Sequence, residues 1–273
     1  MSGRPWPCAI FYTDVDGTMI DSSYRLDPEA PGAALALAEA GVVLVLATSK
    51  TLAEAMMYVD RLGLSRSGGY AVIAEEGAVI HAPPEILPEE RIVTGRMEPE
   101  EALSLLPGEC RARVKPIQWM SPEEVARLTG LPPGEAEAAT MREATAALHG
   151  PRRCLEAGLV EALRRGLYAR LGRVFLMLGR HPGKAGAAVL LEERSPRLRG
   201  VPERYAAGDD PMDEGLLSLA DRAFIVARSG LRPSFTPHLA SYTIVPPAPR
   251  GWVIAAKEAA TAAAHRCGLR GPQ

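Results

Sequence analysis

Hydrophobic and amphipathic stretches alternate in the first 80 residues of the chain. An apolar run at residues 8–13 is followed by an alanine-rich stretch at 31–40 that is typical of a helix. The continuous apolar run at 42–47 is typical of a strand buried on both faces of a parallel sheet. Apolar residues at helical spacing follow at 51–62, and a third strand is predicted at 70–74. This alternation predicts an α/β fold with a doubly wound (Rossmann-like) parallel sheet.

The pattern changes after His81 and returns near Lys184. The intervening stretch is rich in proline and predicts a helix over 121–130, with Ser121 as the N-cap and Glu124 at the capping-box position. Alternating strands and helices then resume and end in an amphipathic helix near 252–265. We therefore expect a core made of residues 1–81 and 181–273, interrupted by an inserted α+β cap domain at 82–180.

Composition narrows the classes of protein. The 273 residues are 47% hydrophobic and 23% charged, which is typical of a folded globular protein. The formal net charge of −2 argues against nucleic acid as a partner. Apolar runs are too short to span a membrane, and the N-terminus lacks the apolar region of a signal peptide, so we expect a cytoplasmic protein without a membrane partner. The four cysteines lie far apart without a C-x-x-C, which predicts buried or idle thiols and neither disulfides nor zinc.

Two aspartates follow the first predicted strand in the segment DVDGT. Asp14 and Asp16 are two residues apart, so both project from the same side of a strand, and Gly17 lets the backbone turn away. Carboxyl ends of strands are where open α/β sheets place their ligands. Two carboxylates at one site imply a divalent cation that compensates their repulsion. The alternative is a plain turn at the end of a strand.

A second acidic cluster, GDDPMD, follows the strand predicted at 204–208. Asp209 could complete an oxygen-only site of the kind that binds Mg²⁺, with Asp213 or Asp210 as a further ligand or a supporting group. The alternative is an acidic helix N-terminus, where the helix dipole favours aspartate. That alternative does not explain the matching cluster at the start of the chain.

Two further residues are candidates for binding phosphoryl oxygens. Thr48 ends the second predicted strand in ATSKT, although a hydroxyl at this position, taken alone, is more often a cap of the next helix. Lys184, in HPGKAG, is one of only four lysines in a chain whose other cations are arginines. A compact ammonium in that position is a candidate counter-charge, and an exposed surface lysine is the alternative.

The order of these segments resembles that of the haloacid dehalogenase-like phosphatase superfamily, with its cap inserted between the second and third motifs. The resemblance implies that Asp14 is a nucleophile forming an aspartyl-phosphate and that Asp16 is the general acid and base. It also implies that Thr48 and Lys184 stabilise the phosphoryl group. Mg²⁺ would be bound by Asp14, Asp209 and the backbone carbonyl of Asp16, with Asp213 behind them and Asp210 as a further candidate.

Longer stretches are similar to the mannosyl-3-phosphoglycerate phosphatases. These are ATSKT, AEEG and residues 121–143 of the expected cap. This resemblance implies a small phosphorylated sugar as substrate, with Arg142, Glu143 and Arg180 reading its sugar and carboxylate. The chain departs from that family at Met212 and Glu76, where asparagine is expected. It departs again after Glu143, where alanines at 146 and 147 replace acidic and hydroxyl residues.

Other functions remain open at this point. Another sugar phosphatase, or a phosphomannomutase-like phosphotransferase, would use the same motifs. A non-catalytic phosphoacceptor module is a more distant alternative. Asp16 and the large insertion argue against it, because a receiver needs neither an acid to expel a sugar nor a cap.

Overall fold

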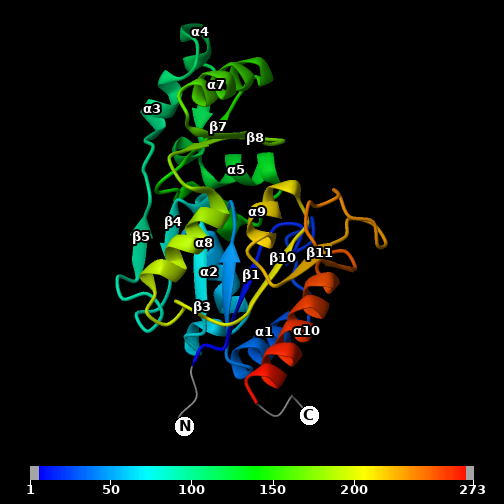
Figure 1. Ribbon diagram of the computed structural model, residues 1–273. Coiled ribbons are helices and arrows are strands. Elements are labelled where there is room, and N and C mark those ends of the chain that lie inside the picture. The colour runs from blue at the N-terminus through cyan, green and yellow to red at the C-terminus, as the bar shows by residue number, and fades with distance from the viewer. Residues whose placement is uncertain (1–5, 269–273) are drawn as a thin grey trace.

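The larger of two β-sheets forms the centre of the molecule (Figure 1). A computed structural model describes residues 6–268. Six neighbouring strands of this sheet run parallel, and two further strands follow on one side, each paired antiparallel with the strand before it. In spatial order the strands are β12 (Thr243–Val245), β11 (Arg222–Val226), β10 (Arg204–Gly208), β1 (Ala9–Thr13), β2 (Val42–Ala47), β3 (Tyr70–Ala74), β4 (Val79–His81) and β5 (Arg91–Val93).

Helices cover both faces of this sheet because its strands are apolar on both sides. In β1, Ala9 and Phe11 point into one core, and Ile10 and Tyr12 point into the other. The first core is closed by α1 (Ala30–Glu39), α2 (Leu52–Arg61) and α10 (Arg250–Arg266). The second is closed by α8 (Gly183–Arg194) and α9 (Glu214–Leu217). The predicted doubly wound α/β fold is confirmed.

The order of the strands creates a crevice between β1 and β10. The chain runs outward from β1 through β2 to β3, and in its second half it runs outward in the opposite direction from β10 through β11 to β12. Loops that leave neighbouring strands in opposite directions open a crevice at the carboxyl ends of those strands. Asp14 follows β1 and Asp209 follows β10, so the two acidic segments flank this crevice.

A smaller antiparallel sheet lies beyond one end of the larger one (Figure 1). Its strands alternate between two apolar clusters, since Leu176 and Leu178 point to one side and Met177 to the other. In spatial order the strands are β6 (Lys115–Pro116), β7 (Ala146–His149), β9 (Leu176–Gly179) and β8 (Tyr168–Leu171). All four lie within the predicted insertion, whereas β5, also within its limits, joins the larger sheet. The boundaries of the cap domain stay a prediction.

Five helices pack on the smaller sheet. On its outer side lie α3 (Pro99–Ser104), α4 (Gly108–Arg111) and α7 (Arg152–Arg164). On the side toward the larger sheet lie α5 (Pro122–Thr129) and α6 (Pro133–Thr140). The helix predicted over 121–130 is confirmed, with both hydrogen bonds of the capping box between Ser121 and Glu124. Single-turn helices complete the described structure: η1 (Leu64–Arg66), η2 (Glu75–Gly77), η3 (Ile117–Trp119) and η4 (Pro211–Asp213).

The prediction of unpaired cysteines is wrong. Cys8 forms a disulfide with Cys267, and Cys110 forms one with Cys154. Spacing along the chain conceals these pairs because tertiary structure brings them together. The start of β1 meets the end of α10 across 259 residues, and α4 packs against α7 in one apolar cluster. Within residues 6–268, the helices are too short or too polar to cross a membrane.

Candidate active site

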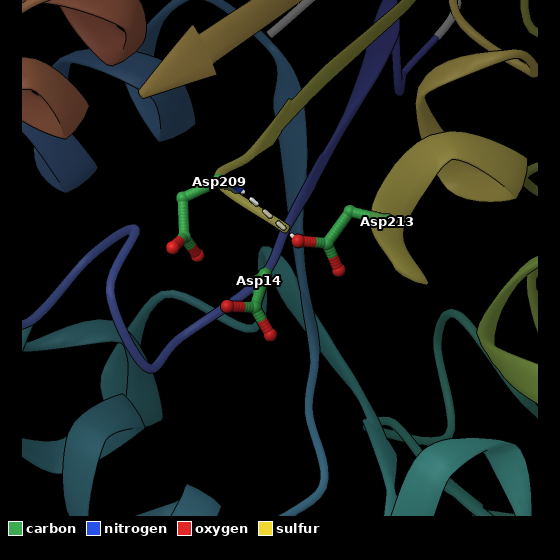
Figure 2. Close-up of side chains that lie close together, drawn as sticks. All are labelled: Asp14, Asp209 and Asp213. Carbon is green, nitrogen blue, oxygen red and sulfur yellow. Dashed lines mark hydrogen bonds between the residues drawn. The ribbon is translucent and has the colours of Figure 1, made fainter. Parts of the chain in front are cut away.

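Three buried carboxylates meet at the crevice between β1 and β10. Asp14, Asp209 and Asp213 each offer an oxygen within 4.8 Å of the others (Figure 2). Asp14 is held at the end of β1, where its amide donates to the carbonyl of Ala207 in β10. The acidic segments predicted to face each other are therefore brought together by parallel pairing of their strands.

The loop after β10 is shaped by its own carboxylates. Oδ2 of Asp213 accepts hydrogen bonds from the backbone amides of Asp209 and Asp210, at 3.2 Å each. Gly208 is required here because a Cβ atom would lie 2.5 Å from that of Asp213. The Asp210 side chain instead accepts from the amide of Met212 and pairs with Arg228 at 3.3 Å. Asp213 therefore joins the cluster, whereas Asp210 lines its rim.

Lys184 provides the positive charge of the cluster. It lies in the first turn of α8, and its Nζ donates to Oδ1 of Asp14 at 2.6 Å and to Oδ1 of Asp213 at 2.9 Å. Burial alone would lower the pKa of Lys184, but these two carboxylates outweigh burial and raise that pKa well above its ordinary value. Lys184 is thus a buried ammonium next to Asp14, and the alternative of an exposed surface lysine is excluded.

Negative charge exceeds positive charge at this site. Burial, reinforced by the carboxylates of Asp213 and Asp16, raises the pKa of Asp14 above its usual range despite Lys184. Burial and the charge of Asp213 raise the pKa of Asp209 to about 6. Among residues 6–268, the Asp209 carboxylate accepts a hydrogen bond from Thr18 and has one ion-pair partner, the guanidinium of Arg228 at 3.7 Å. Buried carboxylates with excess charge are the ligand set that a hard divalent cation such as Mg²⁺ prefers, so Asp14, Asp209 and Asp213 fit a metal site.

Asp16 and Thr48 lie beside the cluster and not in it. The Asp16 side chain is 42% exposed, and its Oδ1 lies 3.1 Å from Nζ of Lys50. Thr48 is fully buried, and its hydroxyl accepts a hydrogen bond from the amide of Lys50. A cavity opens above the carboxylates, and it is lined by Ser49 and not by Thr48. The roles predicted for Asp16 and Thr48 stay predictions.

Two adjoining cavities open above the carboxylates. The inner cavity, about 140 Å³, has Asp14, Lys184 and Asp209 in its wall. The outer cavity, about 240 Å³, lies between the two sheets and is lined partly by residues of α5, α6, β7 and β9. Asp16, Ser49 and Arg170 line both, so a molecule with a phosphoryl group in the inner cavity could extend into the outer one.

The three predicted substrate contacts are placed differently. Arg142 lines the outer cavity, where its guanidinium donates to the Thr145 hydroxyl at 2.7 Å and the Ser49 carbonyl at 3.0 Å. The Glu143 carboxylate pairs with Arg91, and Arg180 pairs with Glu101 on the surface. Neither Glu143 nor Arg180 lines either cavity. Their part in substrate binding stays a prediction, and each already has an ion pair that explains its charge.

Sequence reasoning assigned no role to three cations of the outer cavity, and it noted the partner of one of them, Glu76, only as a departure from the family. Lys50, Arg170 and Arg173 line the outer cavity, and Glu76 in the wall of the inner cavity pairs with Arg170. Arg170 belongs to β8 and is half-buried beside the Glu76 carboxylate, so the contact between them depends on how the smaller sheet lies over the larger one. Lys50 could have been proposed from the sequence as a site residue, because it is one of only four lysines and stands within ATSKT.

Known proteins resemble this chain in sequence over part of its length and in fold over most of it. Residues 11–106 match the family described as haloacid dehalogenase-like hydrolases. A haloacid dehalogenase-like hydrolase from Bacteroides thetaiotaomicron superposes with a TM-score of 0.70 at 18% identity, covering 91% of this chain and 98% of that one. The chain has the fold of the haloacid dehalogenase-like hydrolases.

Two other solved structures share this hydrolase fold. A protein from Thermotoga maritima superposes with a TM-score of 0.68 at 14% identity, covering 91% of this chain and 96% of the other. A sugar phosphatase described as subclass IIB of the superfamily superposes with a TM-score of 0.65 at 16% identity, covering 91% and 98%. In each the likeness in fold covers 91% of this chain and so extends well beyond the residues of the family match.

Proposed function

We propose that this chain is a Mg²⁺-dependent phosphate-monoester hydrolase that acts through an aspartyl-phosphate on Asp14. The observation that carries the proposal is the contact of Asp14 with Lys184 at the base of the inner cavity. A carboxylate is a suitable nucleophile when a neighbouring cation offsets its repulsion from an anionic phosphate. The family match and the sugar phosphatase of the same fold support a phosphatase.

In the first step, a carboxylate oxygen of Asp14 attacks phosphorus, and the bond from phosphorus to the ester oxygen breaks. Asp16 gives its proton to the departing oxygen. In the second step, water attacks the phosphorus of the aspartyl-phosphate, Asp16 takes a proton from that water, and inorganic phosphate leaves with Asp14 restored. Asp16 suits this role because it lies at the junction of the two cavities, where the ester oxygen would be.

The remaining residues act on the charge of the phosphoryl group. Lys184 would stabilise its oxygens while their charge redistributes, with the hydroxyl of Thr48 or Ser49 on the opposite side. Asp14, Asp209 and the backbone carbonyl of Asp16 would hold Mg²⁺, with Asp213 beside or behind them. When bound, that ion supplies positive charge that reduces the repulsion between phosphate and carboxylates.

The substrate that we propose is mannosyl-3-phosphoglycerate, which would be hydrolysed to mannosylglycerate and phosphate. Its carboxylate and sugar hydroxyls would lie in the outer cavity, where Arg142, Arg170 and Arg173 supply guanidinium groups that match carboxylates in geometry. The similarity of residues 121–143 to the corresponding phosphatases supports this choice.

A phosphate-release assay tests the proposal. Purified protein is given Mg²⁺ with mannosyl-3-phosphoglycerate, other sugar phosphates and 4-nitrophenyl phosphate. We expect the mannosyl compound to be hydrolysed best, and release to stop in excess chelator and in a folded Asp14→Asn variant. Better hydrolysis of another sugar phosphate would contradict the proposed substrate and identify that compound as the better candidate. Release that depends on an added sugar bisphosphate would indicate a phosphotransferase.

A further inference from the structure

Lys50 is a buried cation without an assigned role, although it contacts Asp16. Its side chain is 5% exposed, and its Nζ lies 3.1 Å from Oδ1 of Asp16 and 3.7 Å from Oε1 of Glu54. The rings of Tyr24 and Tyr58 lie 5.1 and 5.7 Å from Nζ. Two carboxylates and two aromatic faces replace water around the ammonium, which keeps a buried lysine charged.

The surroundings of Lys50 fix its position. Its amide donates to the Thr48 hydroxyl at 3.1 Å, and its carbonyl accepts from the amide of Glu75 at 2.8 Å. The two tyrosines are held in turn by the helices under the smaller sheet. Tyr24 donates to the carbonyl of Thr129 at 2.9 Å, and Tyr58 to Glu135 at 2.6 Å. The ammonium is therefore a fixed point between the two sheets.

Asp16 has the opposite character. Its carboxylate is 42% exposed and lies near the negatively charged cluster of Asp14, Asp209 and Asp213, which repels it. Among residues 6–268, Lys50 is the one cation within ion-pairing distance of Asp16. The pair therefore joins a fixed, buried cation to a carboxylate that would otherwise be free to turn into solvent.

We propose that Lys50 is a positioning residue for Asp16, holding its carboxyl group at the junction of the two cavities, where it can give a proton to the departing ester oxygen and later take one from water. This inference rests on the proposed function, because it assigns Lys50 to the acid–base step. The compact ammonium makes these contacts as a point charge, and a planar guanidinium would present a different geometry to the two carboxylates.

Two other roles for Lys50 lead to different kinetics. A purely structural ion pair would affect all substrates through the amount of folded protein. A direct contact with substrate in the outer cavity would affect binding of the sugar phosphate, and hence KM. A positioning role affects kcat, and only when the departing oxygen needs a proton.

The experiment compares two esters in the wild type and in Lys50→Met. One is the best sugar phosphate from the release assay, whose alkoxide must be protonated, and the other is 4-nitrophenyl phosphate, whose phenolate leaves without help. We expect Lys50→Met to lose roughly tenfold or more in kcat on the sugar phosphate and less than about threefold on the nitrophenyl ester. Lys50→Arg should recover part of the loss. Lys115→Met, which removes a lysine paired with Glu124 on the surface, is the matched control.

A double-variant cycle with Asp16→Asn completes the test. If Lys50 acts through Asp16, adding Lys50→Met to Asp16→Asn should cause little further loss on the sugar phosphate. Should Lys50→Met fold poorly, Lys50→Met combined with Glu54→Gln removes the buried carboxylate left without its cation, and the comparison of esters is made there. Equal losses on both esters, a change confined to KM, or additive losses with Asp16→Asn would overturn the positioning role. No phosphate release by the wild type from either ester would instead refute the proposed function.

Discussion

The Nζ atom of Lys184 lies 2.6 Å from Oδ1 of Asp14, and both side chains are buried at the carboxyl end of β1. The ammonium is bound a second time by Asp213, from the loop after β10. The ammonium of α8 thus binds carboxylates from the two loops that follow β1 and β10. This arrangement holds the Asp14 carboxylate in a fixed orientation at the base of the inner cavity.

Replacing Lys184 should lower kcat strongly. We expect Lys184→Ala to lose on the order of 10²-fold, because it removes one preorganised charge-stabilising donor, and Lys184→Arg to recover only part. Steady-state kinetics on one sugar phosphate measure the effect, with circular dichroism as the check on folding. Lys257→Ala, which removes an exposed lysine paired with Glu29, is the control. A folded Lys184→Ala variant with nearly unchanged kcat would contradict the mechanism.

The stability of the metal-free protein should depend on Asp209. Its pKa is raised to about 6 in the folded protein, by burial first and by Asp213 second, whereas an unfolded aspartate titrates near ~3.9. The folded state therefore binds the proton more tightly. Protonation of Asp209 therefore stabilises the folded protein. This stabilisation is fully present below about pH 4 and is lost as the pH rises through about 6.

Asp209→Asn should remove that loss. In chelator, we expect the free energy of unfolding of the variant to rise relative to wild type between pH 4 and pH 8, by roughly 1–3 kcal/mol. Urea titrations at several pH values measure it, with the exposed Glu109→Gln as control. Added Mg²⁺ should stabilise the wild type more than the variant. A pH-independent difference would contradict the raised pKa of Asp209, and equal stabilisation of both proteins by Mg²⁺ would contradict its role as a metal ligand.

Sequence patterns predicted an element correctly where the residues of that element alone determine its structure. The apolar run at 42–47 became β2 with identical limits, and Ser121 and Glu124 formed the predicted capping box. The acidic segments after β1 and β10 also met as expected, because parallel neighbours end at the same edge of a sheet.

Contacts between the two sheets were beyond reach of those patterns. Arg170 meets Glu76 only because β8 lies over the loop after β3, and neither residue stands in a motif that specifies the approach. Glu143 and Arg180 have ion-pair partners 52 and 79 positions away, which spacing cannot indicate. The disulfides were missed for the same reason.

The Cys110–Cys154 disulfide should contribute measurably to stability. It closes a segment of 44 residues between α4 and α7, so it restricts the unfolded chain. We expect Cys110→Ala/Cys154→Ala to lower the free energy of unfolding by roughly 2–4 kcal/mol, with kcat retained because the pair lies on the outer side of the smaller sheet. The double variant should also have a lower Tm than the wild type, and reductant should lower the Tm of the wild type by at least the same number of degrees. An unchanged Tm in both experiments would show that the bridge does not form in solution.

Glu75 should be among the most sensitive positions for stability. It follows β3 in the larger sheet, is fully buried, and has left-handed backbone geometry with φ +51°. Its carboxylate accepts hydrogen bonds from the amides of Glu143, Ala144 and Thr145, at 2.7, 3.1 and 2.8 Å, and from the Thr145 hydroxyl at 2.8 Å. These residues lead into β7, so one side chain connects the two sheets.

Glu75→Ala would leave three amides and a hydroxyl without this acceptor, and all but the amide of Glu143 are fully buried. We expect it to lower the free energy of unfolding by roughly 3 kcal/mol or more, and Glu75→Gln to cost less, because its amide keeps one accepting oxygen. Urea unfolding measures both, with the exposed Glu100→Ala as control. A loss below about 1 kcal/mol in Glu75→Ala would mean that water reaches the amides of residues 143–145, and hence that the two sheets separate at this point in solution.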